Sequence, residues 1–247
     1  MKNKSIIITG AASGMGAASA RKFSKSGANV TIVDINEGLA FQVANEIKTT
    51  DPIIGDIGDS SFCKKVIEST IERYGKVDVL VNCAGTILRA NAENTTDDDW
   101  HRVMSTNVNG LFFMSRAAIT PMIKNGNGVI INFGSIWGSV GSAGVVAYCA
   151  SKGAVHQITR AMALDHAKDG IRINSVCPGE VNTPMLSTGR KSPPTKEDLQ
   201  KLADETIPVA RLAEPEEIAN VVYFLASEDA SYMTGSMITV DGGFTTR

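Results

Sequence analysis

Residues 4–16 read KSIIITGAASGMG, an apolar run followed by glycines at positions 10, 14 and 16. The run at 4–9 predicts a buried strand, and the alanine-rich segment 17–26 predicts a helix that ends at Gly27. Glycines in such a turn allow a tight bend and let a diphosphate approach the helix N-terminus, where unpaired N–H groups and the helix dipole favour anions. A glycine cluster alone is often only a turn. Between a strand and a helix it indicates a dinucleotide site.

The same alternation of strand and helix continues along the chain. Further strands are predicted at 28–34, 52–55, 77–81, 128–133, 171–177 and 237–240. Helices are predicted at 37–48, 59–74, 109–124 and 147–168, with others that start at Thr95 or Thr96, near Lys196 and at Glu214. The pattern predicts the α/β class, with a parallel sheet covered on both faces in a single domain over residues 1–247. Ligands of such sheets bind at the carboxyl ends of the strands.

Composition excludes several other classes. The net charge is −2 with both signs interspersed, so neither a nucleic-acid footprint nor a basic membrane patch is present in the sequence. The start of the chain lacks the long apolar run of a signal peptide or spanning segment, and we expect a cytoplasmic protein. The four cysteines have no metal-ligand spacing and are expected to be reduced core thiols, and the three histidines are too dispersed for a metal site.

An acid ends the second predicted strand. Asp34 lies eighteen residues after Gly16, where a carboxylate can accept both ribose hydroxyls of an adenosine and repel a 2′-phosphate. Ile35 and Asn36 follow, so no cation is in place to pair with that phosphate, and we predict NAD rather than NADP. A cap for the helix at 37–48 is an alternative role for Asp34, compatible with the first. Asp56 and Ile57 follow the third strand, where they can hold an adenine edge.

A proton-transfer site is predicted from Ser135, Tyr148 and Lys152. Tyr148 and Lys152 stand four residues apart and share a face of the predicted helix, while Ser135 follows the strand at 128–133. A phenol of pKa about 10 becomes a useful acid or base near neutrality if positive charge stabilises the phenolate. An exposed Tyr–Lys pair without chemistry is the alternative.

The sequence resembles the short-chain dehydrogenase/reductase family over essentially its whole length. The resemblance rests on motifs in the family's order: Thr9-Gly10-x-x-x-Gly14-x-Gly16, Asp56, Asn82-x-Ala84-Gly85, Asn107, Ser135, Tyr148-x-x-x-Lys152 and Pro178-Gly179-x-Val181-x-Thr183. The tail, from Tyr232 to Gly243, is similar to the subgroup of 3-oxoacyl reductases and secondary-alcohol dehydrogenases. Cys83 stands where the family often has a second Asn, and we expect no functional consequence because a small buried side chain serves there.

The resemblance implies a Rossmann-type, doubly wound sheet of about seven strands and a set of site residues. The implied catalytic residues are Asn107, Ser135, Tyr148 and Lys152. The implied cofactor-binding residues are Gly10, Ser13, Gly14, Met15, Gly16, Asp34, Ile35, Asp56, Ile57, Asn82, Ala84, Gly85, Tyr148, Lys152, Pro178, Gly179, Val181 and Thr183. Tyr148 is then the acid in reduction and the base in oxidation, and Lys152 with an oxidised nicotinamide lowers its pKa from about 10 to about 7, which requires roughly 4 kcal/mol. Ser135 holds the substrate oxygen, Asn107 anchors a water relay, and no metal is needed.

The implied activity is NAD-dependent interconversion of a secondary alcohol and a ketone. The alternatives are an NADPH-dependent 3-oxoacyl reductase and a dinucleotide-sensing protein without chemistry. Substrate residues are expected after the motifs, at Ser135, Trp137, Tyr148, Glu180 and Met185, with 185–207 as a substrate-binding lid. Glu180 is expected either to bind substrate hydroxyls or an amine, or to be solvated. Arg89, Arg190 and Lys191 either attract an anionic substrate or are simply exposed, so polyols, hydroxy acids and cyclic alcohols all remain open.

A homotetramer is implied by the resemblance, with the helices at 109–124 and 147–168 at one interface. Small residues that would allow close approach of the second helix are Ala147, Ala150, Ala154, Ala161 and Ala163.

Overall fold

The sheet carries the site, and its strand order decides where the site lies. A computed structural model describes residues 1–246, in which seven strands pair in the order β3-β2-β1-β4-β5-β6-β7, every pair parallel. The strands are β1 (Ser5–Thr9), β2 (Asn29–Asp34), β3 (Ile53–Ile54), β4 (Val79–Asn82), β5 (Gly128–Phe133), β6 (Ile171–Pro178) and β7 (Met237–Val240). The order reverses between β1 and β4, and this switch point opens a crevice at the carboxyl ends of the strands.

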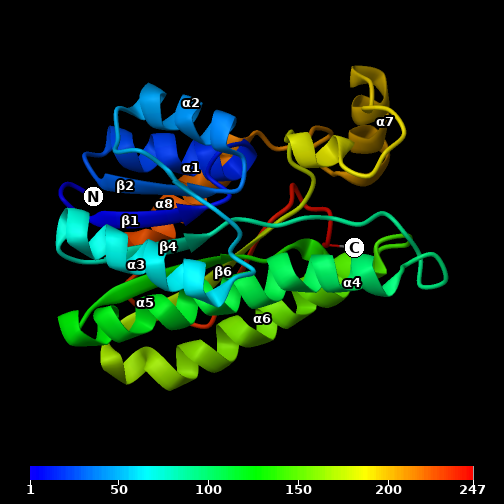
Figure 1. The fold of residues 1–247 in the computed structure, drawn as a ribbon. Helices are drawn as coiled ribbons and strands as arrows, with labels where there is room; N and C mark the ends of the chain where they lie inside the picture. The colour runs from blue at the N-terminus through cyan, green and yellow to red at the C-terminus, as the bar shows by residue number, and fades with distance from the viewer. Residues whose placement is uncertain (247) are drawn as a thin grey trace.

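Helices cover both faces of the sheet (Figure 1). One face carries α1 (Gly14–Lys25), α2 (Glu37–Ile47) and α8 (Pro215–Ala226), and the other carries α3 (Ser60–Tyr74), α5 (Leu111–Asn125) and α6 (Val146–His166). In β1, Ile6 and Ile8 join the core of the first face and Ile7 joins the core of the second. A strand with both faces buried must be apolar at every position, which explains the unbroken isoleucine run.

The structure confirms the predicted architecture and corrects one helix. Predicted strand bounds differ from the observed ones by at most two residues. A helix carrying Asn107 and a separate helix at 109–124 were expected, but α4 (Asp97–Met104) continues through a π-helical segment, Ser105–Gly110, directly into α5. A π turn adds a residue without ending the helix, so it shifts the apolar periodicity and makes one long helix read as two.

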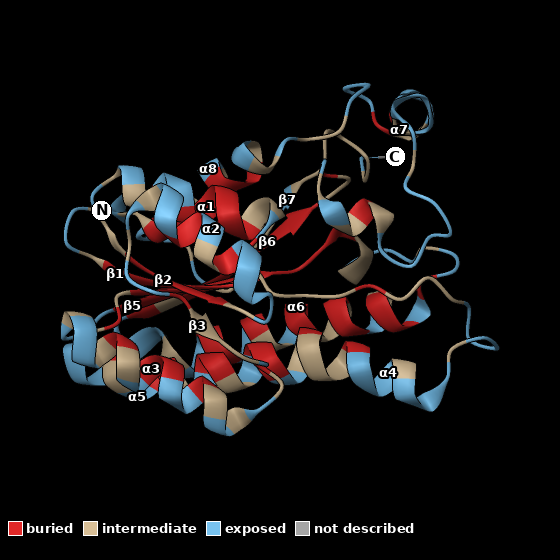
Figure 2. Ribbon diagram, turned by 45° about the horizontal axis from the view of Figure 1, so that its top comes forward, coloured by how far each residue is buried: buried red, intermediate tan, exposed pale blue. Residues whose placement is uncertain are grey.

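Helix α7 (Lys196–Thr206) stands apart from the sheet in Figure 1, and Figure 2 shows that most of its surface is exposed. Short 3-10 segments occur at Ile136–Gly138, Ala167–Asp169, Pro184–Ser187 and Glu228–Ala230. After β7 the chain turns back toward the segment that follows α7, and Val209 N donates to Gly242 O over 3.3 Å. Among residues 1–246, no helix is long and apolar enough to cross a membrane.

Candidate active site

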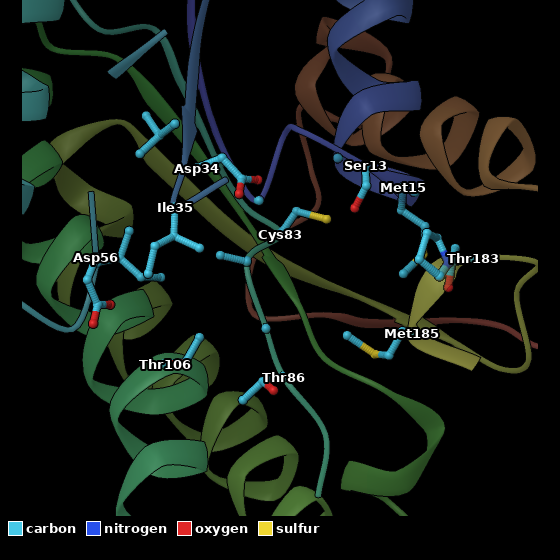
Figure 3. Close-up of a pocket in the computed structure, with 18 of the residues that line it drawn as sticks. Ser13, Met15, Asp34, Ile35, Asp56, Cys83, Thr86, Thr106, Thr183 and Met185 are labelled. Carbon is cyan, nitrogen blue, oxygen red and sulfur yellow. The ribbon is translucent and has the colours of Figure 1, made fainter. Parts of the chain in front are cut away.

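A cavity of about 540 Å³ lies at the switch point. Twelve predicted cofactor residues line it: Gly10, Ser13, Gly14, Met15, Gly16, Asp34, Ile35, Asp56, Ile57, Ala84, Gly85 and Thr183. Figure 3 shows Asp34, Ile35 and Asp56 at one end and Ser13 and Thr183 at the other. The sheet thus brings together residues that the sequence places after five different strands, β1, β2, β3, β4 and β6.

Glycine is required at this cavity because a Cβ would collide with neighbouring backbone atoms, and at Gly10 also because the backbone has a positive φ. Gly10 has φ +66°, and a Cβ there would lie 2.6 Å from Ala84 Cα, while a Cβ on Gly16 would overlap the carbonyl oxygen of Gly10. Within Gly14–Lys25, the first turn of α1 holds no acidic residue, and the Ser13 side chain accepts no cap hydrogen bond. The positive end of α1 therefore remains available to an anion, and the glycine cradle fits the diphosphate of a dinucleotide.

Asp34 fixes the loop around it while it faces the cavity. Its Oδ2 accepts from Ala12 N and its Oδ1 from Asn36 N, each over 2.9 Å. The expected alternative role as a helix cap is wrong, because Asn36 is the N-cap of α2 and its side chain accepts from Leu39 N. Each carboxylate oxygen of Asp34 retains a lone pair, so it can still accept from a ribose hydroxyl.

A second cavity, of about 160 Å³, adjoins the first and holds Ser135, Tyr148 and Lys152. The two cavities share lining residues, namely Met15, Cys83, Gly85, Thr183 and Met185. Tyr148 is 8% exposed and Lys152 is 5% exposed, so these side chains are not a solvated surface pair. Pro178, Gly179 and Val181 line this smaller cavity, so the predicted cofactor residues are divided between the two spaces.

Burial governs the electrostatics of this cluster. Burial raises the pKa of Tyr148 to about 12, although its hydrogen bond with Ser135 lowers that pKa in part. Burial also lowers the pKa of Lys152 to about 8. Lys152 Nζ donates to Phe133 O over 2.7 Å and lies 5.5 Å from the centre of the Tyr148 ring. Burial therefore outweighs the contacts of the protein's own groups with the phenol, and the prediction that Lys152 and an oxidised nicotinamide together lower its pKa stays a prediction.

Two asparagines from the family motifs lie outside both cavities. Asn107 lies in the π-helical segment, where Oδ1 accepts from Thr86 N over 2.8 Å and Nδ2 donates to Thr86 O and to Ser151 Oγ, both over 2.9 Å. It therefore clamps the backbone that follows Gly85. Asn82 is buried in the core, and its Nδ2 donates to Ser115 and Asn132. Asn82 thus supports the sheet, and the prediction that it contacts the cofactor is not matched by its position.

The predicted substrate residues Trp137, Glu180 and Met185 line the second cavity together with Ser135 and Tyr148. Behind Trp137 stands Phe244 of the chain's tail, with ring centres 5.3 Å apart and an interplanar angle of 85°. Of the described residues in 185–207, only Met185 and Leu186 line either cavity, so α7 does not contribute to the walls.

Two of the three basic residues considered for an anionic substrate instead hold the start of the lid segment. Arg89 Nε donates to Thr188 O over 3.0 Å, and Arg190 Nε donates to Leu186 O over 2.8 Å. Arg89 also lines the second cavity, whereas Arg190 and Lys191 are exposed and line neither. The substrate wall therefore depends on contacts between segments that are about 100 residues apart in the chain.

Sequence reasoning missed several residues of the larger cavity. Cys83, Thr86, Arg102 and Thr106 all line it. Arg102 reaches Thr86 Oγ1 over 3.4 Å and Asp99 over 2.8 Å. Cys83 and Thr86 are adjacent to the motif at 82–85 and could have been found from it. Arg102 and Thr106 carry no local signal, because only the packing of α4 and the π-helical segment brings them to the cavity.

The cradle and the adjoining cavity define the class of protein, a dinucleotide-dependent oxidoreductase. A family model described as "Enoyl-(Acyl carrier protein) reductase" matches residues 10–245. The chain is 40% identical to the meso-2,3-butanediol dehydrogenase of Serratia marcescens, over 98% of this chain and 95% of the relative. It is 37% identical to a 3-oxoacyl-[acyl-carrier-protein] reductase of Thermotoga maritima, over 98% of both chains.

A solved structure, that of a short-chain type dehydrogenase/reductase from Mycobacterium marinum, superposes with a TM-score of 0.93 at 32% identity, covering 100% of this chain and 97% of the other. The chain therefore belongs to the short-chain dehydrogenase/reductase family, as its motifs predicted. It is an oxidoreductase, and the family binds a nicotinamide dinucleotide.

Proposed function

We propose that the protein interconverts a secondary alcohol and a ketone, with NAD as its cofactor. The observation that carries the proposal is the position of Ser135, Tyr148 and Lys152 in a small cavity that shares five lining residues with the dinucleotide cavity. A substrate oxygen in the small cavity is thereby within reach of a proton donor and of the cofactor's reactive end. The Serratia marcescens relative, named as a butanediol dehydrogenase, supports an alcohol as substrate.

In this proposal Tyr148 moves the proton. The phenol gives its proton to the ketone oxygen during reduction and takes it from the carbinol during oxidation, while the Ser135 hydroxyl orients that oxygen. When bound, the oxidised nicotinamide accepts the hydride and supplies a positive charge beside the phenol. Lys152 would hold the ribose next to that ring, and Asn107 would keep the loop after Gly85 in place and help to anchor a water relay. Since burial raises the pKa of Tyr148, the positive charge of the oxidised nicotinamide would be needed to lower that pKa before the phenol could act as the base in oxidation.

The preference for NAD is attributed to Asp34. Its carboxylate lines the dinucleotide cavity, and a 2′-phosphate placed on the adjacent ribose would meet a like charge. We expect kcat/KM with NADH to exceed that with NADPH by about 100-fold or more, since a repelled phosphate costs several kcal/mol. Equal values for the two cofactors would remove the NAD assignment while leaving the alcohol chemistry in place.

The role of Tyr148 is tested with the Tyr148→Phe variant. The substitution removes the phenolic oxygen and keeps the ring, so turnover should fall by about 1,000-fold or more while the dissociation constant for NADH changes little. The assay is NADH formation from a panel that includes meso-2,3-butanediol, 2-butanol, cis-1,2-cyclohexanediol and cyclohexanol. Activity of the variant near that of the wild type would refute the assignment.

An NADPH-dependent 3-oxoacyl reductase is the second candidate, supported by the Thermotoga maritima relative. The charge of Asp34 and the small second cavity both argue against it. Efficient reduction of an acetoacetyl thioester with NADPH, and no oxidation of the alcohol panel, would favour this alternative. Tight NADH binding without turnover of any panel substrate would favour a dinucleotide sensor.

We also propose that the protein is a cytoplasmic homotetramer that uses the outer surface of α5 and α6. Exposed apolar residues on these helices and the adjoining α4 are Trp100, Phe112, Ile123, Val146 and Leu164. Of the small residues expected there, Ala147 and Ala163 are instead buried within the chain, which leaves Ala150, Ala154 and Ala161 on the outer side of α6. Light scattering at micromolar concentration should give four times the mass of one chain.

A further inference from the structure

The most unusual group in the second cavity is the carboxylate of Glu180. Glu180 follows β6 by two residues, and its backbone is held by a bridge to the segment before α8, in which Ala213 N donates to Glu180 O over 3.0 Å and Asn182 N donates to Ala213 O over 2.9 Å. The side chain lines the same cavity as Tyr148 and Ser135. A carboxylate on a fixed backbone is thus presented to whatever occupies this cavity.

Within the described residues, this carboxylate has neither a hydrogen-bond donor nor an ion pair within 4.0 Å. Burial raises its pKa, and Arg89 and Arg190 lower it only from a distance. Both guanidinium groups already hold carbonyls of the lid segment through Nε. Glu180 is half-buried and its carboxylate faces the cavity without a donor from the protein, so it has acceptor sites that a hydroxyl of a ligand can use.

The carboxylate also acts against the proposed chemistry. A negative charge near Tyr148 raises the pKa of the phenol and so opposes loss of its proton. An apolar residue at position 180 would avoid this effect. The presence of an acid here is therefore accounted for by recognition of the substrate and not by proton transfer.

A positive charge in the cavity, in addition to Lys152, limits what the substrate can be. Arg89 lines the cavity with Glu180, so a cationic amine would be repelled by the guanidinium and a carboxylate by Glu180. A neutral hydroxyl is compatible with both, because it can donate to the carboxylate and accept from Arg89. At about 160 Å³ the cavity is well below the roughly 300–1,000 Å³ of sites for drug-sized ligands, which favours a compact molecule.

We propose that Glu180 accepts a hydrogen bond from a second hydroxyl of the substrate, which makes the enzyme selective for compact diols and polyols over mono-alcohols. This inference rests on the proposed alcohol dehydrogenase activity. Tyr148 and Ser135 act on the carbinol that reacts, and Glu180 selects the hydroxyl on a neighbouring carbon.

The test compares alcohols that differ by one hydroxyl, meso-2,3-butanediol against 2-butanol and cis-1,2-cyclohexanediol against cyclohexanol. Hydrogen bonds to charged groups contribute about 1.5–3 kcal/mol, so Glu180→Ala should lower kcat/KM for the diol of each pair by about 10- to 100-fold and change that of the mono-alcohol less than about threefold. Glu180→Gln keeps a neutral acceptor and should fall between wild type and Glu180→Ala. The matched control is Glu72→Gln, which removes an exposed carboxylate on α3, far from the cavity, and should leave every ratio unchanged.

Unchanged NADH affinity and melting temperature in Glu180→Ala would show that the variant is folded with an intact cofactor site. A ratio of diol to mono-alcohol that is the same in an active wild type and in Glu180→Ala overturns the inference and leaves the proposed function standing. A Glu180-dependent preference for 3-amino-2-butanol over the diol also overturns it, in favour of a cationic substrate. A wild type that oxidises no alcohol of the panel with either cofactor overturns the proposed function and this inference together.

Discussion

The two ends of the active site are built in different ways. At the cofactor end, residues stand directly at the carboxyl ends of β1, β2 and β4, and the backbone itself forms the cradle around Gly10 and Gly16. At the substrate end, the wall is assembled from side chains that no strand holds, including Trp137, Arg89 and Met185. Phe244 of the tail supports this wall from behind. The cofactor end is thus fixed by the fold, whereas the substrate end is fixed by contacts between loops.

The difference has a physical consequence. A backbone cradle can bind the diphosphate common to all nicotinamide dinucleotides, but its geometry cannot change without moving the sheet. A wall of loop side chains can change one contact at a time, so substrate preference can differ among proteins that share the same sheet. We therefore expect substitutions at the cofactor end to affect folding and binding together, and substitutions at the substrate end to affect substrate selection alone.

The largest effect is expected from Gly10→Ala. A left-handed φ costs a residue with a Cβ about 1–2 kcal/mol, and overlap with the backbone of Ala84 adds about 1–3 kcal/mol. Gly126→Ala is the matched control, since Gly126 has φ +63° against +66° at Gly10 but a Cβ there would meet nothing within 4 Å. In urea unfolding, the free energy of unfolding should fall by about 3 kcal/mol or more in Gly10→Ala and by about 1 kcal/mol in Gly126→Ala.

NADH titration should show binding weakened by about 100-fold or more in Gly10→Ala alone, because the loops on either side of the cavity are forced apart. If the two variants lost equal stability and both bound NADH normally, the cradle would not be fixed by the contact between β1 and β4, and the comparison between the two ends would fail.

The contrast also explains what the sequence could predict. The glycines, Asp34 and the Ser–Tyr–Lys set follow directly from strands or share a helix face, so local pattern was enough to find them. The contact of Phe244 with Trp137 and the tie from Arg89 to Thr188 join segments about 100 residues apart. No local sequence pattern predicts such contacts. Nor does any local pattern predict that the side chain of Asn82 points into the core. Even the raised pKa of Tyr148 depends on burial, which spacing alone does not reveal.

Lys152, which lines the smaller cavity, should show a conflict between function and stability. Its pKa in the folded protein, about 8, is below the value of 10.5 for the free side chain, so keeping it protonated opposes folding at neutral pH. That penalty is complete below pH 8 and disappears as the pH rises toward 10.5. At 1.36 kcal/mol per pKa unit, and after about 1 kcal/mol is subtracted for the lost bond to Phe133 O, Lys152→Met should stabilise the protein by about 2 kcal/mol at pH 7.

Urea unfolding at pH 7 and at pH 10 would measure this effect, and the gain of Lys152→Met should be much smaller at the higher pH. Lys64→Met, at an exposed lysine on α3, is the control and should change stability little at either pH. Turnover of Lys152→Met should be lost despite its higher stability. A variant that is less stable than the wild type at pH 7 would contradict the burial penalty assigned to this ammonium.

The smallest effect is expected from Phe244→Ala. An edge-to-face aromatic pair contributes about 0.5–1.5 kcal/mol, so removing the Phe244 ring should free Trp137 to move and change KM for the alcohol by about threefold to tenfold. Phe244→Leu retains apolar bulk behind Trp137 and should lie closer to the wild type. NADH affinity should stay the same in both, because Trp137 lines only the smaller cavity among those described for residues 1–246. Steady-state kinetics with the alcohol varied, beside NADH titration, separates these quantities. A loss of NADH binding in Phe244→Ala would mean that the tail also supports the cofactor end, and the two ends would then not be independent.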